Sequence, residues 1–171
     1  MLRPLVAHTC SRSEKGELAR LQLAEQLLQS EDPSKHAWEA AALALALLRS
    51  TTSPERRARA NHALALGYTI LGHYRAARSA YGRALVDVPD DPVAAHNLGH
   101  LLDVVFARPK SALPWLSLAY RQLTDDAEVA ASYAHALCRS GELERARCVL
   151  RRAVPEARQV EEWLERWSGQ A

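Results

Sequence analysis

The chain has 171 residues, of which 48% are hydrophobic and 25% are charged, and its formal net charge is +2. A chain of this length and composition is long enough to fold as one domain with its own core. The net charge is too small to indicate binding to nucleic acid or to a membrane surface.

Cysteine content and the lengths of apolar runs indicate the cellular compartment of the protein. Cys10, Cys138 and Cys148 show no C-x-x-C spacing, which argues against a disulfide framework or a zinc knuckle and favours free thiols in a reducing compartment. The first residues hold no apolar run long enough for a signal peptide, and no run anywhere approaches the length of a membrane span. We therefore expect a cytoplasmic protein.

The sequence predicts α-helices along the whole chain. Ala, Leu, Arg and Glu dominate, and no stretch alternates apolar and polar residues for long enough to predict a strand. Proline and turn residues interrupt the chain at regular places: 30–34, 50–55, 71–74, 88–92, 106–111, 123–126, 139–142 and 154–156.

The first predicted element after a flexible N-terminus (1–12) is a helical pair within 13–50. Its helices are expected at 14–29 and 35–49. Trp38 lies on this pair, which we expect to be exposed at the end of the molecule, so self-association through it is possible.

Three further helical pairs are predicted over 54–91, 92–125 and 126–155, and they repeat the same residue types. Leu64 recurs as Leu98 and then as Tyr133, at steps of 34 and 35 residues. The second helices repeat a small-large-small pattern: Ala77, Tyr81 and Ala84; Ala112, Leu116 and Ala119; Ala146, Leu150 and Ala153. One extra residue between Leu102 and Ala112 accounts for the irregular steps.

This spacing resembles the tetratricopeptide repeat (TPR), whose signature is W-x2-L-G-x2-Y, A-x3-F-x2-A and P. Residues 58–91 match it best, at Leu64, Ala65, Tyr68, Gly72, Tyr74, Ala77, Tyr81, Ala84 and Pro89. The signature tryptophan is absent from all three units, and the middle unit lacks the turn glycine.

The resemblance implies an all-α fold. We expect a right-handed helical-repeat solenoid of three TPR-like helix pairs in a single domain over 13–171, with 13–50 as a degenerate pair. Residues 156–168 are predicted to form a capping helix, because Val160, Trp163, Leu164 and Trp167 share one apolar stripe.

The resemblance also implies a concave groove lined by one stripe of each first helix. Carried over by position, the groove stripe is Arg59, His62, Leu66, Thr69 and Ile70; Val93, His96, Asn97, His100, Asp103 and Val104; Glu128, Ala131, His135, Cys138 and Arg139. We expect His62, His96, His100 and His135 to form a loose lattice on the open side of the stack.

Three interpretations of these histidines remain open. We favour a wet peptide-binding groove in which imidazoles hydrogen-bond a partner. The second is a metal site of His96, His100 and Asp103, joined by His135 or Cys138. The third is a nucleophilic arrangement of Cys138, His135 and Asp103, although a solenoid offers no oxyanion hole.

The groove stripe predicts the chemistry of the partner. Among its residues only Arg59, Asn97 and Arg139 could contact an anion, so a carboxylate clamp of the kind that grips chaperone C-termini is not expected. The apolar Leu66, Ile70, Val93 and Val104 favour a peptide with apolar anchors and some acidic residues.

The predicted function is that of a non-enzymatic adaptor or assembly factor that binds a partner protein or peptide, with no cofactor, nucleic acid or membrane. The alternatives are a dedicated chaperone of a secretion system and a metal-binding protein. The arginine-rich stretch from Arg49 to Arg83 is interpreted as a solvated outer face.

Overall fold

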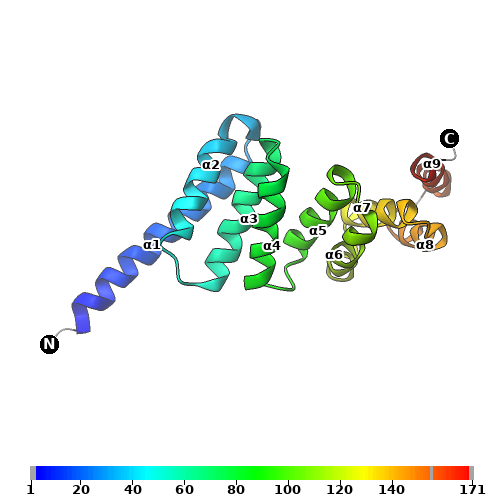
Figure 1. The fold of residues 1–171 in the computed structure, drawn as a ribbon. Helices are drawn as coiled ribbons and strands as arrows, with labels where there is room; N and C mark the ends of the chain where they lie inside the picture. Colours follow the sequence, from blue (N-terminus) through cyan, green and yellow to red (C-terminus); the bar gives the residue numbers. More distant parts are fainter. Residues whose placement is uncertain (1–2, 155, 170–171) are drawn as a thin grey trace. The chain divides into compact units, whose positions relative to one another are not determined.

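The computed structural model describes the backbone of residues 3–154 and 156–169, and the side chains of residues 14–154 and 156–169. Within these ranges the secondary structure is helical, with no strand (Figure 1). The chain divides into two compact units, residues 1–89 and 90–171. Of the segment predicted as flexible at 1–12, residues 1–2 lie outside the described backbone and residues 3–12 are helical. The state of Cys10 falls on residues whose side chains are not described.

The described part of unit 1 contains four helices, and consecutive helices pack against each other. They are α1 (Arg3–Leu28), α2 (Pro33–Leu48), α3 (Pro54–Ile70) and α4 (Tyr74–Asp87). Helices α2 and α3 begin with proline, which suits the first helical position because its missing N–H is not needed there. Ser53 caps α3 by accepting a hydrogen bond from the Arg56 backbone N–H at 3.3 Å.

Unit 2 contains five α-helices and one π-helical turn in its described residues. They are α5 (Pro92–His100), η1 (Leu101–Val105), α6 (Pro109–Gln122), α7 (Ala127–Arg139), α8 (Leu143–Ala153) and α9 (Ala157–Ser168). Asp91 and Asp126 cap α5 and α7, each through two backbone N–H groups. No helix in the described parts of either unit is long and apolar enough to cross a membrane.

The small residues of the repeat pattern lie where neighbouring helices touch. Ala77 and Ala84 on α4, Ala112 and Ala119 on α6, and Ala146 on α8 are all fully buried, whereas Ala153 at the end of α8 is half-buried. The larger members, Tyr81, Leu116 and Leu150, are also buried, as the pattern predicts. Small side chains let helix axes approach closely, and the larger ones fill the space between successive helices.

The extra residue predicted between Leu102 and Ala112 is absorbed inside a helix. The connections α3–α4, η1–α6 and α7–α8 each contain three residues, so none of these loops is longer than the others. The first helix of the middle pair instead ends in η1, whose π-helical winding takes up the added residue.

The turn after η1 adopts a left-handed backbone without glycine. Gly72 and Gly141 end their first helices with φ of 76° and 86°, and Ala107 occupies the equivalent position with φ of 52°. The middle pair therefore keeps the same turn geometry at the cost of about 1–2 kcal/mol of backbone strain.

The last helix seals unit 2 as the capping helix was expected to do. Val160 and Leu164 of α9 are buried, and α9 packs on both α7 and α8. Arg147 of α8 donates to the Glu161 carboxylate at 3.1 Å, which ties the polar side of the cap to its neighbour.

Gly99 lies at a close contact between two helices of unit 2. A Cβ built on Gly99 would lie 2.5 Å from Leu116 Cγ, whereas one on Gly82, also inside a helix, would meet nothing within 4 Å. We expect Gly99→Ala to lower the free energy of unfolding by about 1–3 kcal/mol through overpacking. Gly82→Ala, the matched control, should raise it by about 0.5–1 kcal/mol. Urea unfolding measures both, and equal effects would contradict the close packing.

Candidate functional site

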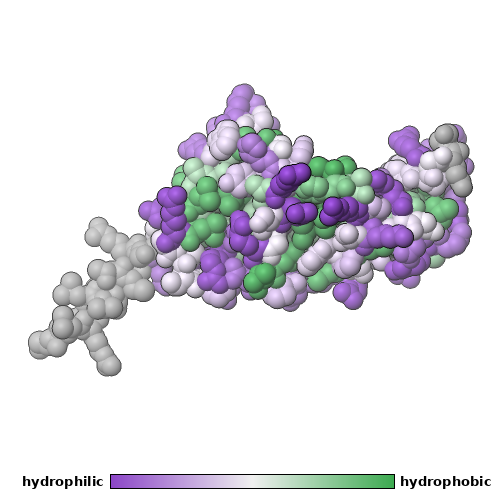
Figure 2. All heavy atoms as spheres, in the orientation of Figure 1, coloured by the Kyte–Doolittle hydropathy of each residue, from purple (hydrophilic) through white to green (hydrophobic). Residues whose placement is uncertain are grey.

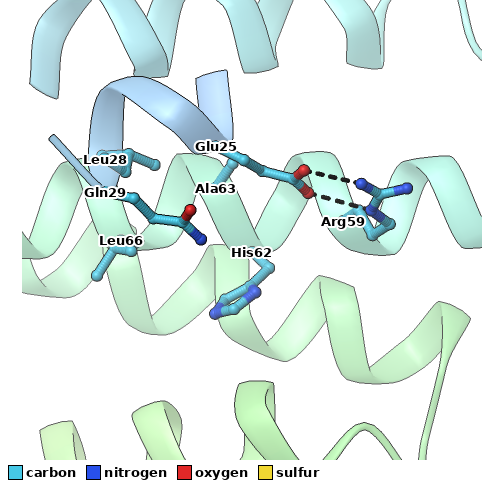
Figure 3. A pocket seen from close by; sticks show the side chains of 7 residues that line it. All are labelled: Glu25, Leu28, Gln29, Arg59, His62, Ala63 and Leu66. Atoms are coloured by element: carbon cyan, nitrogen blue, oxygen red, sulfur yellow. Dashed lines mark hydrogen bonds and ion pairs between the residues drawn. The ribbon is translucent and has the colours of Figure 1, made fainter. Parts of the chain in front are cut away.

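Unit 1 has a pocket of about 180 Å³ between α1 and α3, which we call the unit 1 pocket (Figure 3). Its walls are Glu25, Leu28 and Gln29 from α1, and Arg59, His62, Ala63 and Leu66 from α3. Three predicted groove residues, Arg59, His62 and Leu66, thus share one pocket. The α1 wall was not predicted, because the groove stripe was drawn only from the clearer repeats.

Arg59 is already engaged by an internal carboxylate. Its Nε and Nη2 donate to the two carboxylate oxygens of Glu25 at 3.1 and 2.8 Å (Figure 3). The Arg59 side chain is 48% exposed in this bidentate pair, so an acidic group of a partner would have to compete with Glu25 for it. The ring of His62 packs against Tyr81, with centroids 5.7 Å apart.

Unit 2 has a pocket of about 250 Å³, the unit 2 pocket, on the corresponding face of its first helices. It is lined by His100, Val104, Ala131, Ser132, His135 and Trp167. In the repeat register, Leu66 of unit 1 corresponds to His100 and His135, and His62 corresponds to Ala131. The two pockets are therefore built from equivalent first-helix positions.

His96 is more buried than we expected. Only 9% of its surface is exposed, and its Nε2 lies 3.0 Å from Ser132 Oγ of α7. The same hydroxyl lies 3.3 Å from His100 Nδ1, so Ser132 joins the two histidines. The expectation that both imidazoles lie on the open side is wrong for His96, because α7 covers it. His100 alone of this pair reaches the pocket.

Asp103 also lies inside the structure instead of lining the groove. It is 2% exposed, accepts a hydrogen bond from Arg139 Nη1 at 2.9 Å, and lies 2.5 Å from His135 Nδ1. Arg139 Nη1 also donates to the Asp103 backbone oxygen at 2.7 Å. Asp103 belongs to η1, so the π-helical turn presents a carboxylate to two residues of α7. Arg139, like Arg59, is paired internally.

This pairing orients the histidine that lines the unit 2 pocket. Asp103 contacts Nδ1 of His135, so Nε2 is the ring nitrogen that could contact a ligand. The ring of His135 meets Trp167 of α9 edge to face, with centroids 5.2 Å apart. Trp167, assigned only to packing by the sequence pattern, is thus also a wall of the pocket.

The two other interpretations of the histidines lack the geometry they need. Among the described side chains, no group of three or more His, Cys, Asp or Glu residues is arranged to hold a metal ion. His96, His100 and Asp103 are not a ligand set, because Asp103 is held by His135 and Arg139. Burial raises the pKa of Cys138 to about 11, so its thiol stays protonated at neutral pH.

The remaining groove residues lie outside both pockets. Thr69 Oγ1 donates to the Ala65 backbone oxygen on its own helix at 2.9 Å, and Ile70 is half-buried at the end of α3. Val93 is 46% exposed, whereas Asn97 is half-buried and makes contacts of its own. The predicted four-histidine lattice spans both units and stays a prediction.

Two solved structures share this fold. The crystal structure described as "YrrB: a TPR protein with an unusual peptide-binding site" has 20% identity and a TM-score of 0.75, and the match covers 95% of this chain and 82% of that one. The "MamA RS-1 ArsTM double mutant" has 16% identity and a TM-score of 0.68, covering 90% and 95%. No protein-family profile and no curated protein sequence matches the chain. The chain has the helical-repeat fold of the tetratricopeptide proteins, which confirms the resemblance found in its residues.

The buried Asp103 carboxylate gives a stability prediction. Asp103→Asn removes the charge that Arg139 and His135 face, and we expect the free energy of unfolding to fall by about 2–3 kcal/mol, less than for a fully buried pair because Arg139 is 32% exposed. Glu162→Gln makes the same chemical change in an exposed pair with Arg158 and should cost less than about 0.5 kcal/mol. Equal losses in urea unfolding would refute a special role for Asp103.

His96 gives a pH prediction. Burial is the main cause that lowers the pKa of His96, and His100 adds to it, while Glu128 and Asp126 oppose it. Because the folded pKa is below the ordinary value of 6.5, the unfolded chain takes up a proton first as the pH falls, so this stability is present above about pH 6.5 and is lost below it.

His96→Gln should remove this contribution. The difference in unfolding free energy between wild type and variant is expected to shrink as the pH is lowered from about 7.5 to about 5. His36→Gln, at a solvent-exposed ring, controls for the loss of an imidazole. Parallel pH profiles for wild type and His96→Gln would contradict the assigned direction.

Proposed function

We propose that this protein is a non-enzymatic interaction module that binds peptide segments of a partner protein at pockets on the first helices of each unit. The observation that supports this most is the pair of pockets at equivalent repeat positions, one between α1 and α3 and the other on α5, η1, α7 and α9. The fold adds support, since one solved neighbour is described as having a peptide-binding site. The adaptor or assembly role that we propose requires only that this surface bind a partner protein.

The pocket walls favour apolar anchors joined by backbone hydrogen bonds. Leu28 and Leu66 supply apolar surface in unit 1, and Val104 and Trp167 do so in unit 2. His100 and His135 contribute imidazole nitrogens that bond peptide amides or side chains. Since Arg59 and Arg139 are paired internally, we expect acidic groups of a partner to contact these histidines. Acidic residues of the partner therefore contribute less to binding than the sequence pattern indicated.

Site-specific photo-crosslinking in the source cells tests this function. A photoreactive side chain placed at Leu66 or Val104 should form adducts with a partner protein, because both residues line pockets. The same group at Val86, which is 80% exposed and lines neither pocket, is the control and should not. In addition, Val104→Asp should weaken capture of the identified partner by about tenfold or more, and Val86→Asp should leave it unchanged. Adducts confined to Val86 would reject the proposal.

A further inference from the structure

Unit 1 has another pocket, larger than the one in Figure 3 and separate from it. It measures about 550 Å³ and is lined by Trp38, Tyr68, Gly72, His73, Tyr74, Arg75 and Ala76. We call it the aromatic pocket. It shares no residue with the unit 1 pocket, and its walls come from α2, the end of α3, the α3–α4 turn and the start of α4. A partner bound there would leave the unit 1 pocket and the unit 2 pocket, together called the first-helix pockets, unoccupied.

The aromatic pocket is built around His73. Trp38 and Tyr68 both meet the His73 ring, with centroids 5.6 and 6.0 Å away and ring planes at 64° and 79°. Rings that cross at such angles form notches between their faces, unlike a single flat platform. Trp38 is 63% exposed, and the other three tryptophans are half-buried. Covering an exposed indole with a partner's apolar group is strongly favourable.

The charges around the aromatic pocket select against a cation. No carboxylate lines it, whereas Arg75 does, and the Arg75 guanidinium is exposed with no ion-pair partner among the described side chains. A methylated ammonium group, which aromatic walls could otherwise hold, would be repelled by Arg75. An occupant with a negative charge beside its apolar group complements the site.

Proline is the apolar group that suits notches of this kind. A proline-rich segment forms a polyproline II helix with little further entropy to lose, its rings pack between aromatic side chains, and its unpaired carbonyls accept hydrogen bonds. Trp38, Tyr68 and Tyr74 offer such donors beside their apolar faces. Single-stranded nucleic acid fits less well, because stacked bases need parallel platforms and a track of basic residues, and Arg75 is the sole arginine of the pocket.

We propose that the aromatic pocket binds a proline-rich segment of a partner protein in which an acidic residue lies next to the prolines. Trp38 and Tyr68 pack on the proline rings, and Arg75 pairs with the carboxylate. The segment is a second attachment point, separate from the peptide held by the first-helix pockets.

Selection from a random display library of peptides about twelve residues long tests the proposal. The intact protein is the bait, and each round is counter-selected on Trp38→Ala, which removes peptides that bind the first-helix pockets. Because Trp38 is largely exposed, its loss should leave the fold intact. The enriched peptides are expected to share two prolines about three residues apart with an Asp or Glu nearby.

Fluorescence anisotropy with the best enriched peptide then measures the contribution of Arg75. Arg75→Glu should weaken binding by about tenfold or more and should shift preference to the same peptide with Lys in place of its acid. Arg121→Glu, at an exposed arginine of unit 2, matches the charge change and should have no effect.

Four outcomes overturn the proposal. They are the absence of any enrichment over Trp38→Ala, an enriched motif that lacks proline, tighter binding of oligothymidine or oligouridine than of the peptide, and a concentration-dependent dimer that Trp38→Ala abolishes. None of them bears on the first-helix pockets, whose test uses Leu66 and Val104. Conversely, a failed crosslink at those two residues leaves the aromatic pocket unaffected.

Discussion

Close contact between neighbouring helices is the constraint on which the rest of the structure depends. Fully buried alanines on the second helices, and Gly99 against Leu116 within unit 2, bring helices together at distances that larger side chains would prevent. Because the second helices pack in this way, one face of each first helix takes no part in the contact. That face holds the two first-helix pockets, so the binding surface that we propose is a consequence of how the helices pack.

Charge is distributed in a way that serves the same packing. Arg56, Arg57 and Arg59 stand close together in α3, yet each pairs with a carboxylate of unit 1: Glu17, Asp87 and Glu25 respectively. These three arginines thus form ion pairs between helices of unit 1, whereas Arg49, Arg75, Arg78 and Arg83 are exposed, as expected of a solvated face. On the face drawn in Figure 2, hydrophilic residues lie intermingled with hydrophobic ones.

Much of the fold could be predicted from the sequence because its signals are local. Proline at the start of α2, α3, α5 and α6, and the repeated alanine spacing, set where helices begin and which sides they bury. The site was harder, because a stripe on one helix does not reveal which neighbour covers it. His96 and Asp103 lie on the stripe that the resemblance assigned to the groove, but Ser132, His135 and Arg139 of α7 cover them. Pairings such as Glu25 with Arg59, 34 positions apart, leave no mark in the local pattern.

The π-helical turn has a consequence for how such repeats diversify. Because the added residue is wound into η1, the loops on either side keep their length, and the following helix α6 still meets its neighbours through Ala112 and Ala119. Widening one turn rotates the side chains beyond it, and Asp103 of η1 lies 2.5 Å from the imidazole of His135 in the next helix pair. The insertion of a single residue can in this way change which side chains meet in one repeat, while the helices around it keep their packing.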